Sequence, residues 1–249
     1  MVLGGSGPAP RDRLVGAVGP KTVVVAADSG LEAAMDARIV VHHVVGDLDS
    51  VALAALTVAE RAGAEIHRHP SDKDATDGEL ALDLAVDVLT RSSETRAAPH
   101  LVVVGGGGGR LDHLLGDVMA LLDDRLVAFD VTAHLGPATL TVVRPGRSRS
   151  LVGRPGEVVS LLAPRSAARG VTTRGMRWPL DDGDLAAGST RGTSNEMVSD
   201  EAHVSLRHGT LVAILPGHLA RSVEPRSSAY DPSPRLEDGF GGSEGHRPQ

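Results

Sequence analysis

The chain has no cysteine and very few aromatic residues. Without cysteine among its 249 residues, it can form neither disulfide bonds nor thiolate metal sites. Aromatic residues make up 2% of the sequence and hydrophobic residues 41%, so a core must be built from Val, Leu and Ala. With a net charge of −7 and no basic stripe, nucleic acid is not expected as a partner.

Long apolar segments are also missing. No run reaches the roughly 20 residues that cross a bilayer. Residues 1–13 are rich in Gly and Pro and lack the apolar stretch of a signal peptide. We therefore expect a cytoplasmic protein without a membrane partner, and the missing cysteines agree with a reducing compartment.

The first half of the chain alternates strand and helix patterns. Strands are predicted at Thr22–Ala27, Ile39–Val45, Glu65–His67, Leu101–Val104 and Leu126–Val131, and helices over Leu31–Ala37 and Val51–Ala62 and from Thr76 and Leu111. Thr76 and Glu79 have the spacing of a capping box, with Thr76 as the N-cap. The alternation predicts an α/β, Rossmann-like domain over residues 1–138, with a mostly parallel sheet and flanking helices.

After residue 138 no helix-length periodicity appears. Short strands are predicted at Thr139–Val143, Ser150–Val152, Glu157–Ala163, His203–Leu206 and Thr210–Leu215, separated by Gly and Pro turns. This pattern predicts an all-β domain, a sandwich or half-barrel, over residues 139–216. Residues 217–249 are rich in Pro, Ser, Gly and charge, which predicts a disordered tail.

Acidic residues gather in two loops of the α/β half. Asp47 and Asp49 lie in the first loop, and Asp72, Asp74 and Asp77 lie in the second. Either loop alone has an ordinary explanation, because Asp is common in turns and at helix N-termini. Together, oxygen ligands without cysteine favour a hard ion such as Mg²⁺.

A run of glycines, Gly105–Gly109, follows the strand predicted at Leu101–Val104 and precedes Arg110. It is not a Walker A loop, but backbone N–H groups and a guanidinium at a helix start can bind phosphate. Asp112 could orient Arg110 or join the metal site, and His113 could be a plain surface residue. Because ligands bind at the carboxyl ends of parallel strands, we expect these groups at one sheet edge.

Three further features admit more than one interpretation. Trp178, the only tryptophan, would ordinarily fill a core, but its polar surroundings make stacking on a flat ring plausible. Lys73, between two aspartates, is either charge balance or a phosphate contact. His42 and His43 alternate faces of a strand and are expected to pack or to face solvent.

In order and spacing, these motifs resemble those of the thiamine pyrophosphokinase (thiamine diphosphokinase) family. The matching segments are Ala27–Gly30, Gly46–Ser50, Asp72–Asp77, Gly108–His113, Val171–Leu180, Gly188-Ser189 and Gly192–Asn195. Each is weak alone, but their order over residues 22–216 is specific. The resemblance implies a homodimer with the active site between subunits, which transfers the pyrophosphoryl group of ATP to the hydroxyethyl oxygen of thiamine and releases AMP.

The resemblance also implies roles for single residues. Asp47, Asp49 and Asp77 would hold Mg²⁺ and, with Arg110, serve catalysis. The ATP side would comprise Asp28, Ser50, Asp72, Asp74, Thr76, Gly108, Gly109, Asp112 and His113. Trp178, Ser194 and Asn195 would bind thiamine, contributed by the partner subunit. No residue stands out as a general base.

The chain departs from the family pattern at two positions. Asp117 stands where family members usually have Asn, and a carboxylate cannot donate as an amide does, which affects a nucleotide contact. Ser29 stands where Gly is common, which is tolerable if its φ is negative. Two alternatives stay open: pyrophosphoryl transfer to another hydroxymethyl heterocycle such as a pterin, or a catalytically degenerate protein that only binds thiamine or nucleotide.

Overall fold

The computed structural model describes residues 1–4, 10–92, 98–105 and 110–217. Gly108, Gly109 and the predicted tail beyond Gly217 lie outside these ranges. Within them, none of the helices combines the length and the apolar character of a membrane-spanning segment.

A parallel sheet forms the first half of the molecule, as the sequence predicts. Its strand order is β4-β3-β2-β1-β5-β6, and every neighbouring pair in this part is parallel. The strands are β1 Val2–Leu3, β2 Val25–Ala27, β3 His43–Gly46, β4 Glu65–Arg68, β5 His100–Gly105 and β6 Asp130–Leu135. The order reverses between β1 and β5, so a ligand site is expected beyond the carboxyl ends of these two strands.

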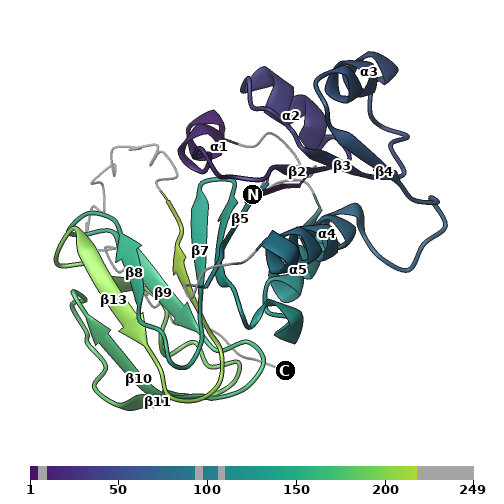
Figure 1. Cartoon of the computed structure of the whole chain (residues 1–249). Coiled ribbons are helices and arrows are strands. Elements are labelled where there is room, and N and C mark those ends of the chain that lie inside the picture. Colours follow the sequence, from purple (N-terminus) through teal and green to yellow (C-terminus); the bar gives the residue numbers. More distant parts are fainter. Residues whose placement is uncertain (5–9, 93–97, 106–109, 218–249) are drawn as a thin grey trace, which may run out of the picture. The chain divides into compact units, whose positions relative to one another are not determined.

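Helices cover both faces of this sheet (Figure 1). The helices are α1 Arg11–Gly16, α2 Gly30–Asp36, α3 Leu53–Arg61, α4 Asp77–Ser92 and α5 Leu111–Ala120. Ala26 and Val44 pack into one apolar core with α1, α2 and α3. Their neighbours Ala27 and Val45 face the opposite way, into a core with α4 and α5. Burial on both faces explains why the strands are apolar without alternation.

The strand β1 was missed in the sequence, although it lies between β2 and β5. Two apolar residues, Val2 and Leu3, are too few to show a periodicity. The position of this strand explains why residue 30 is glycine. A Cβ at Gly30 would lie 2.5 Å from the backbone oxygen of Leu3. The helix α2 therefore begins with Gly because β1 passes directly beneath it.

Some predicted boundaries were also wrong. The strand β2 begins at Val25 and β3 begins at His43, later than expected. The strand expected at Leu126–Val131 begins later, as β6 at Asp130. Asp124–Leu126 forms a 3₁₀ turn instead, in which Asp123 Oδ1 accepts a hydrogen bond from Arg125 N at 2.9 Å. Local capping by Asp123 overrides the apolar character of this segment.

The second half forms the predicted sandwich. Its strands are β7 Ala138–Val143, β8 Arg149–Val152, β9 Val158–Leu162, β10 Ala168–Arg174, β11 Gly183–Leu185, β12 Asn195–Glu196, β13 Glu201–Ser205 and β14 Leu211–Leu215. An antiparallel hairpin of β6 and β7 continues the larger sheet through β14 and β9 to β12. The second sheet, β11-β10-β13-β8, closes one apolar core with it. The domain boundary at residue 138 stays a prediction, and β10 and β11 were not expected from the sequence.

Candidate active site

Three carboxylates meet at the carboxyl ends of β2 and β3. Asp28 follows β2, and Asp47 and Asp49 follow β3. One carboxylate oxygen of each lies within 4.8 Å of the others. The resemblance assigns Asp28 to the ATP side, which stays a prediction, and the structure shows that Asp28 is also part of the carboxylate cluster. Parallel pairing of Ala27 with Val45 brings the two loops together.

The backbone of these loops is unusual and explains how the carboxylates converge. Asp28 and Leu48 have positive φ angles of 44° and 61°, which non-glycine residues adopt rarely. The turn at Leu48 buries that side chain, and Asp49 N donates to Asp47 Oδ1 at 3.3 Å. Ser50 Oγ donates to Asp28 Oδ2 and so links the two loops.

Asp77 joins this cluster from the start of α4. Lys73 Nζ lies 3.1 Å from Asp47 Oδ2 and 3.1 Å from Asp77 Oδ1, with only 14% of its side chain exposed. A Cβ at Gly46 would lie 3.0 Å from Asp77 Oδ1, so a bare glycine lets Asp77 approach the end of β3. Lys73 thus bridges the two acidic loops, which supports charge balance as one of its roles.

The N-cap of α4 is formed as predicted, but the capping box is only half complete. Glu79 N donates to Thr76 Oγ1 at 3.2 Å. The carboxylate of Glu79 does not return to Thr76 and instead lies 3.3 Å from Arg125 Nη2. Thr76 therefore serves at least as a structural cap, and its predicted contact with ATP stays a prediction.

The carboxylate group fits a hard divalent cation. A hydrogen bond from Lys73 lowers the pKa of Asp47, whereas the negative charge of Asp47 raises the pKa of Asp49. Asp28 Oδ1 is buried and makes no hydrogen bond, whereas the equally buried Asp77 Oδ1 is paired with Lys73. Buried oxygens without a hydrogen-bond partner are costly, and oxygen ligands are those that Mg²⁺ prefers.

Asp72 and Asp74 are not part of this cluster. Both side chains are exposed, and among the residues that the structure describes neither has an assigned hydrogen bond or ion pair. Of the five acidic residues in the two loops, the structure therefore brings together Asp47, Asp49 and Asp77.

A cavity of about 330 Å³ adjoins the carboxylates at the edge of the parallel sheet. Its lining includes Gly4, Asp28, Ser29, Lys73, Thr76, Asp77, Gly78, His113 and Asp117. Gly4 and Gly78 were missed in the sequence, since Gly4 follows a strand too short to recognise. Burial raises the pKa of Asp117, the residue that replaces the family Asn. The φ of Ser29 is −60°, so the other departure is accommodated without strain.

Arg110 precedes α5 and is held by Asp112. Arg110 Nε and Nη2 donate to the two oxygens of Asp112 at 3.2 and 2.6 Å. This pairing lowers the pKa of Asp112 to about 2. Of the two roles considered for Asp112, the structure supports orienting Arg110 and not joining the metal group.

A second cavity, of about 420 Å³, lies in the sandwich half and collects the residues predicted for thiamine. It is lined by Leu161, Trp178, Pro179, Leu180, Leu185, Arg191, Gly192, Thr193, Ser194 and Asn195. Trp178 is 57% exposed, so it is not core filler, and Arg177 Cζ lies 5.2 Å from its ring centroid. Arg191 was not anticipated.

Asn195 holds the backbone of Trp178. Its Nδ2 donates to Trp178 O at 2.7 Å, and its Oδ1 accepts from Trp178 N at 3.1 Å. Both polar atoms of the amide are therefore engaged within the protein. Ser194, with a φ of 59°, is fixed by a hydrogen bond from its N–H to Ser160 Oγ at 3.1 Å. Asn195 thus positions the tryptophan, a role that the sequence did not suggest.

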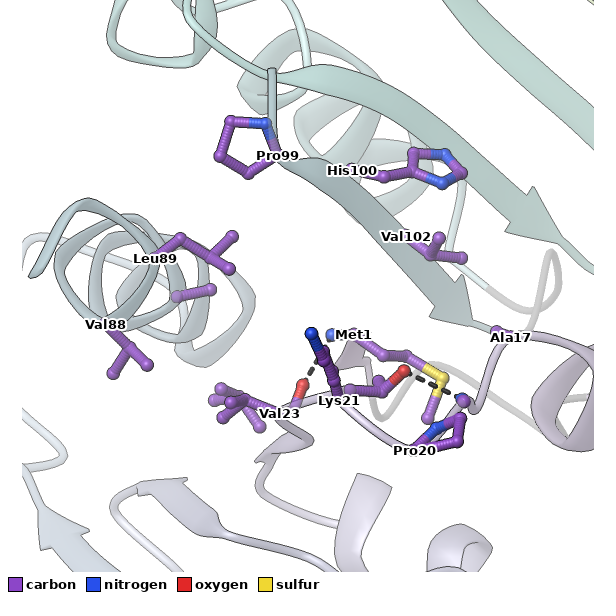
Figure 2. A pocket seen from close by; sticks show the side chains of 14 residues that line it. Met1, Ala17, Pro20, Lys21, Val23, Val88, Leu89, Pro99, His100 and Val102 are labelled. Carbon is purple, nitrogen blue, oxygen red and sulfur yellow. Dashed lines mark hydrogen bonds between the residues drawn. The ribbon is translucent and has the colours of Figure 1, made fainter. Parts of the chain in front are cut away.

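A larger cavity lies elsewhere, at the amino ends of β2 and β5 (Figure 2). Its volume is about 660 Å³, and its lining is mostly apolar. The α-amino group of Met1 donates to Val23 O at 2.6 Å, and burial lowers its pKa to about 6. Among the described residues, none of those predicted for the active site lines it, so size alone does not mark the site.

Carboxylates and a cavity at the carboxyl edge of a parallel sheet lie where open α/β proteins bind their ligands, so fold and site define an α/β ligand-binding domain. Two family models match the chain: "Thiamin pyrophosphokinase, catalytic domain" over residues 18–130, and "Thiamin pyrophosphokinase, vitamin B1 binding domain" over residues 148–211. The chain belongs to the thiamine pyrophosphokinase family.

Individual relatives agree with this assignment. The thiamine pyrophosphokinase of Bacillus subtilis (strain 168) is 25% identical over 202 residues, which cover 81% of this chain and 90% of the relative. A crystal structure of the B. subtilis enzyme matches with a TM-score of 0.70 and 24% identity, covering 88% of this chain and 98% of the other. That of Geobacillus thermodenitrificans matches with a TM-score of 0.68 and 26% identity, covering 88% and 97%.

Proposed function

We propose that this protein is a thiamine pyrophosphokinase that transfers the pyrophosphoryl group of ATP to the hydroxyethyl oxygen of thiamine, giving thiamine diphosphate and AMP. The observation that carries this proposal is the presence of both half-sites. A carboxylate cluster with its cavity lies at the sheet edge of the part matched by the catalytic model. A cavity with an exposed tryptophan lies in the part matched by the vitamin-binding model.

On the nucleotide side, we propose that Asp47, Asp49 and Asp77 hold Mg²⁺, with Asp28 beside them. A bound Mg²⁺ would neutralise charge on the polyphosphate. Two cationic side chains can act at the same place. Lys73 already lies between the two acidic loops, and Arg110 is held in one orientation by Asp112. A preorganised guanidinium stabilises charge that develops on the transferred group and on departing AMP.

On the acceptor side, we propose that the ring of Trp178 stacks on thiamine. Thiamine carries a positive charge and flat rings, both of which bind well to an indole face. The two hydrogen bonds between Asn195 and the main chain of Trp178 fix that main chain before the substrate arrives, which lowers the entropic cost of binding. Ser194 adds a hydroxyl to the same cavity.

We further propose that two copies form a homodimer with the thiamine half-site contributed by the partner. Leu111, Leu115 and Met119 on α5 support this, because they are 69%, 56% and 55% exposed. At a spacing of four residues they lie on one helix face. Three large apolar side chains in a row are unusual on a monomer surface and common in subunit interfaces. A cytoplasmic location remains a prediction.

The test is a reaction with purified protein, ATP, Mg²⁺ and thiamine. Equal amounts of AMP and thiamine diphosphate are expected. Asp49→Asn should abolish turnover while the far-ultraviolet circular dichroism stays unchanged. Asp87→Asn is the matched control, since within the described part of the chain this exposed carboxylate on α4 pairs with Arg91 alone. Formation of ADP, or normal turnover by Asp49→Asn, would contradict the proposal.

The same reaction separates the two alternatives. A hydroxymethyl pterin offered together with thiamine should remain unmodified, and preferential transfer to the pterin would favour a different pyrophosphokinase. Calorimetric binding of thiamine without any turnover would favour a degenerate binding protein.

A further inference from the structure

A second group of side chains that could hold a metal ion lies on β3 and β4, the two strands at one edge of the sheet (Figure 1). His43 is on β3, and Glu65 and His67 are on β4. Parallel pairing sets His43 opposite Glu65 and Val45 opposite His67, so the three side chains share one face. None of these residues belongs to the carboxylate cluster.

The three side chains converge on one point. His43 Nδ1 lies 3.2 Å from His67 Nε2 and 3.5 Å from Glu65 Oε2. His67 Nε2 lies 3.7 Å from the same oxygen. Zn²⁺ binds imidazole nitrogen and carboxylate oxygen at roughly 2.0–2.2 Å, and tetrahedral geometry then separates the ligand atoms by about 3.3–3.6 Å. The observed triangle therefore already has the dimensions of a three-ligand site, within a few tenths of an ångström.

Hydrogen bonding alone explains this arrangement incompletely. One imidazole can donate to the other at 3.2 Å. The carboxylate oxygen of Glu65, at 3.5 and 3.7 Å, is too far for good hydrogen bonds to either ring. The neighbouring His42 shows the contrast, because its Nδ1 accepts a hydrogen bond from Val24 N at 3.1 Å and is fully explained by the fold.

We propose that His43, Glu65 and His67 form a binding site for a divalent transition-metal ion such as Zn²⁺, separate from the carboxylate cluster. Two imidazoles and one carboxylate suit Zn²⁺, Co²⁺ or Ni²⁺, whereas Mg²⁺ prefers oxygen ligands only. The side chain of His43 is 15% exposed and that of Glu65 is 71% exposed, so a fourth ligand can come from solvent.

The position of the site suggests what the metal does. The strand β4 pairs only with β3 within the described sheet, and it ends at Arg68, just before the loop that carries Lys73 and Asp77. A metal bound across both strands would hold β4 in register on β3. It would thereby support the loop that reaches the carboxylate cluster.

The test is a calorimetric titration of metal-stripped, untagged full-length protein with ZnCl₂. Excess MgCl₂ is present so that Zn²⁺ does not simply occupy the carboxylate cluster. We expect one Zn²⁺ per chain. His67→Ala and Glu65→Gln should each weaken Zn²⁺ binding by at least roughly 10- to 100-fold. Losing a residue that only supports a metal ligand already costs that much, and each of these changes removes a ligand itself.

His203→Ala is the matched control. This exposed histidine also lies near a glutamate, at 3.9 Å from Glu201, but it is not part of a group of three metal-ligating side chains among the described residues. It should bind Zn²⁺ like the wild type, as should Asp49→Asn. With Co²⁺, the visible absorption of a four-coordinate site is expected in the wild type and not in His67→Ala. Wild-type affinity in His67→Ala, loss of binding in Asp49→Asn, or no Zn²⁺ bound to the wild type would overturn the proposal.

Discussion

Replacing Gly30 by Ala tests the central position of β1, which is the part of the fold that the sequence did not reveal. In the wild type, the Cβ of an alanine at position 30 would lie 2.5 Å from Leu3 O and 3.1 Å from Leu3 C. Ordinary contact begins at 3.4 Å, so the two groups must separate by about 0.9 Å. Leu3 is fully buried and paired on both sides, with Ala26 and Val104, so its backbone cannot move freely.

The expected cost follows from this geometry. Forcing an extra carbon into a packed core costs about 1–3 kcal/mol. In a helix interior, alanine is at most about 1 kcal/mol more favourable than glycine in the free energy of helix formation, and the advantage is smaller at the first position of α2. Gly116→Ala is the matched control, because Gly116 lies within α5 and a Cβ there meets nothing within 4 Å. The difference in unfolding free energy between the two variants is therefore at least about 1–3 kcal/mol, with Gly30→Ala less stable.

Urea unfolding followed by far-ultraviolet circular dichroism measures this difference. With a slope of about 2 kcal/mol per molar urea, the midpoint of Gly30→Ala should lie roughly 0.5–1.5 M below that of Gly116→Ala. Gly116→Ala itself should be as stable as the wild type or slightly more stable. If Gly30→Ala matched or exceeded the control, β1 would not pass beneath α2 and the placement of Leu3 would be wrong.

Three further predictions concern the two half-sites and the subunit contact. Trp178→Ala should raise the KM for thiamine far more than the KM for ATP. Asn195→Ala should have the same but weaker effect, because it frees the backbone of Trp178. Equal effects on the KM values of both substrates would contradict the stacking role. Asp47→Asn removes the negative charge that raises the pKa of Asp49, so the pKa of Asp49 should fall in Mg²⁺-free protein. Nuclear magnetic resonance can follow the titration of the Asp49 carboxyl group. An unchanged titration would refute this electrostatic coupling. Leu115→Glu should dissociate the proposed dimer in sedimentation velocity, whereas an unchanged sedimentation coefficient would argue against α5 as the interface.

The class of fold could be predicted from the sequence because it follows from local patterns. Apolar runs that stop at Asp28 and Gly46 predict buried parallel strands with polar loops at their carboxyl ends, and the structure confirms this. The spacing of Thr76 and Glu79 predicted where α4 begins, since an N-cap acts within one helical turn. These features depend on residues only a few positions apart.

The convergence of distant residues was decided by strand order and register. The insertion of β1 between β2 and β5 placed Gly4 at the cavity beside the carboxylate cluster, although a two-residue strand carries almost no pattern of its own. Pairing of β2 with β3 moved Asp28 into the carboxylate cluster, while Asp72 and Asp74 stayed exposed.

Register likewise determined which polar side chains interact across strands. His43 was expected only to pack or to face solvent, yet it meets Glu65 and His67 because β3 and β4 pair in parallel. Asn195 was expected to touch a ligand, yet its amide is engaged by Trp178, 17 residues earlier in the chain. Local sequence thus determined which elements form and which of them end in reactive side chains. Tertiary structure alone determined which of those side chains meet, because distances across a sheet depend on pairing between segments far apart in the chain.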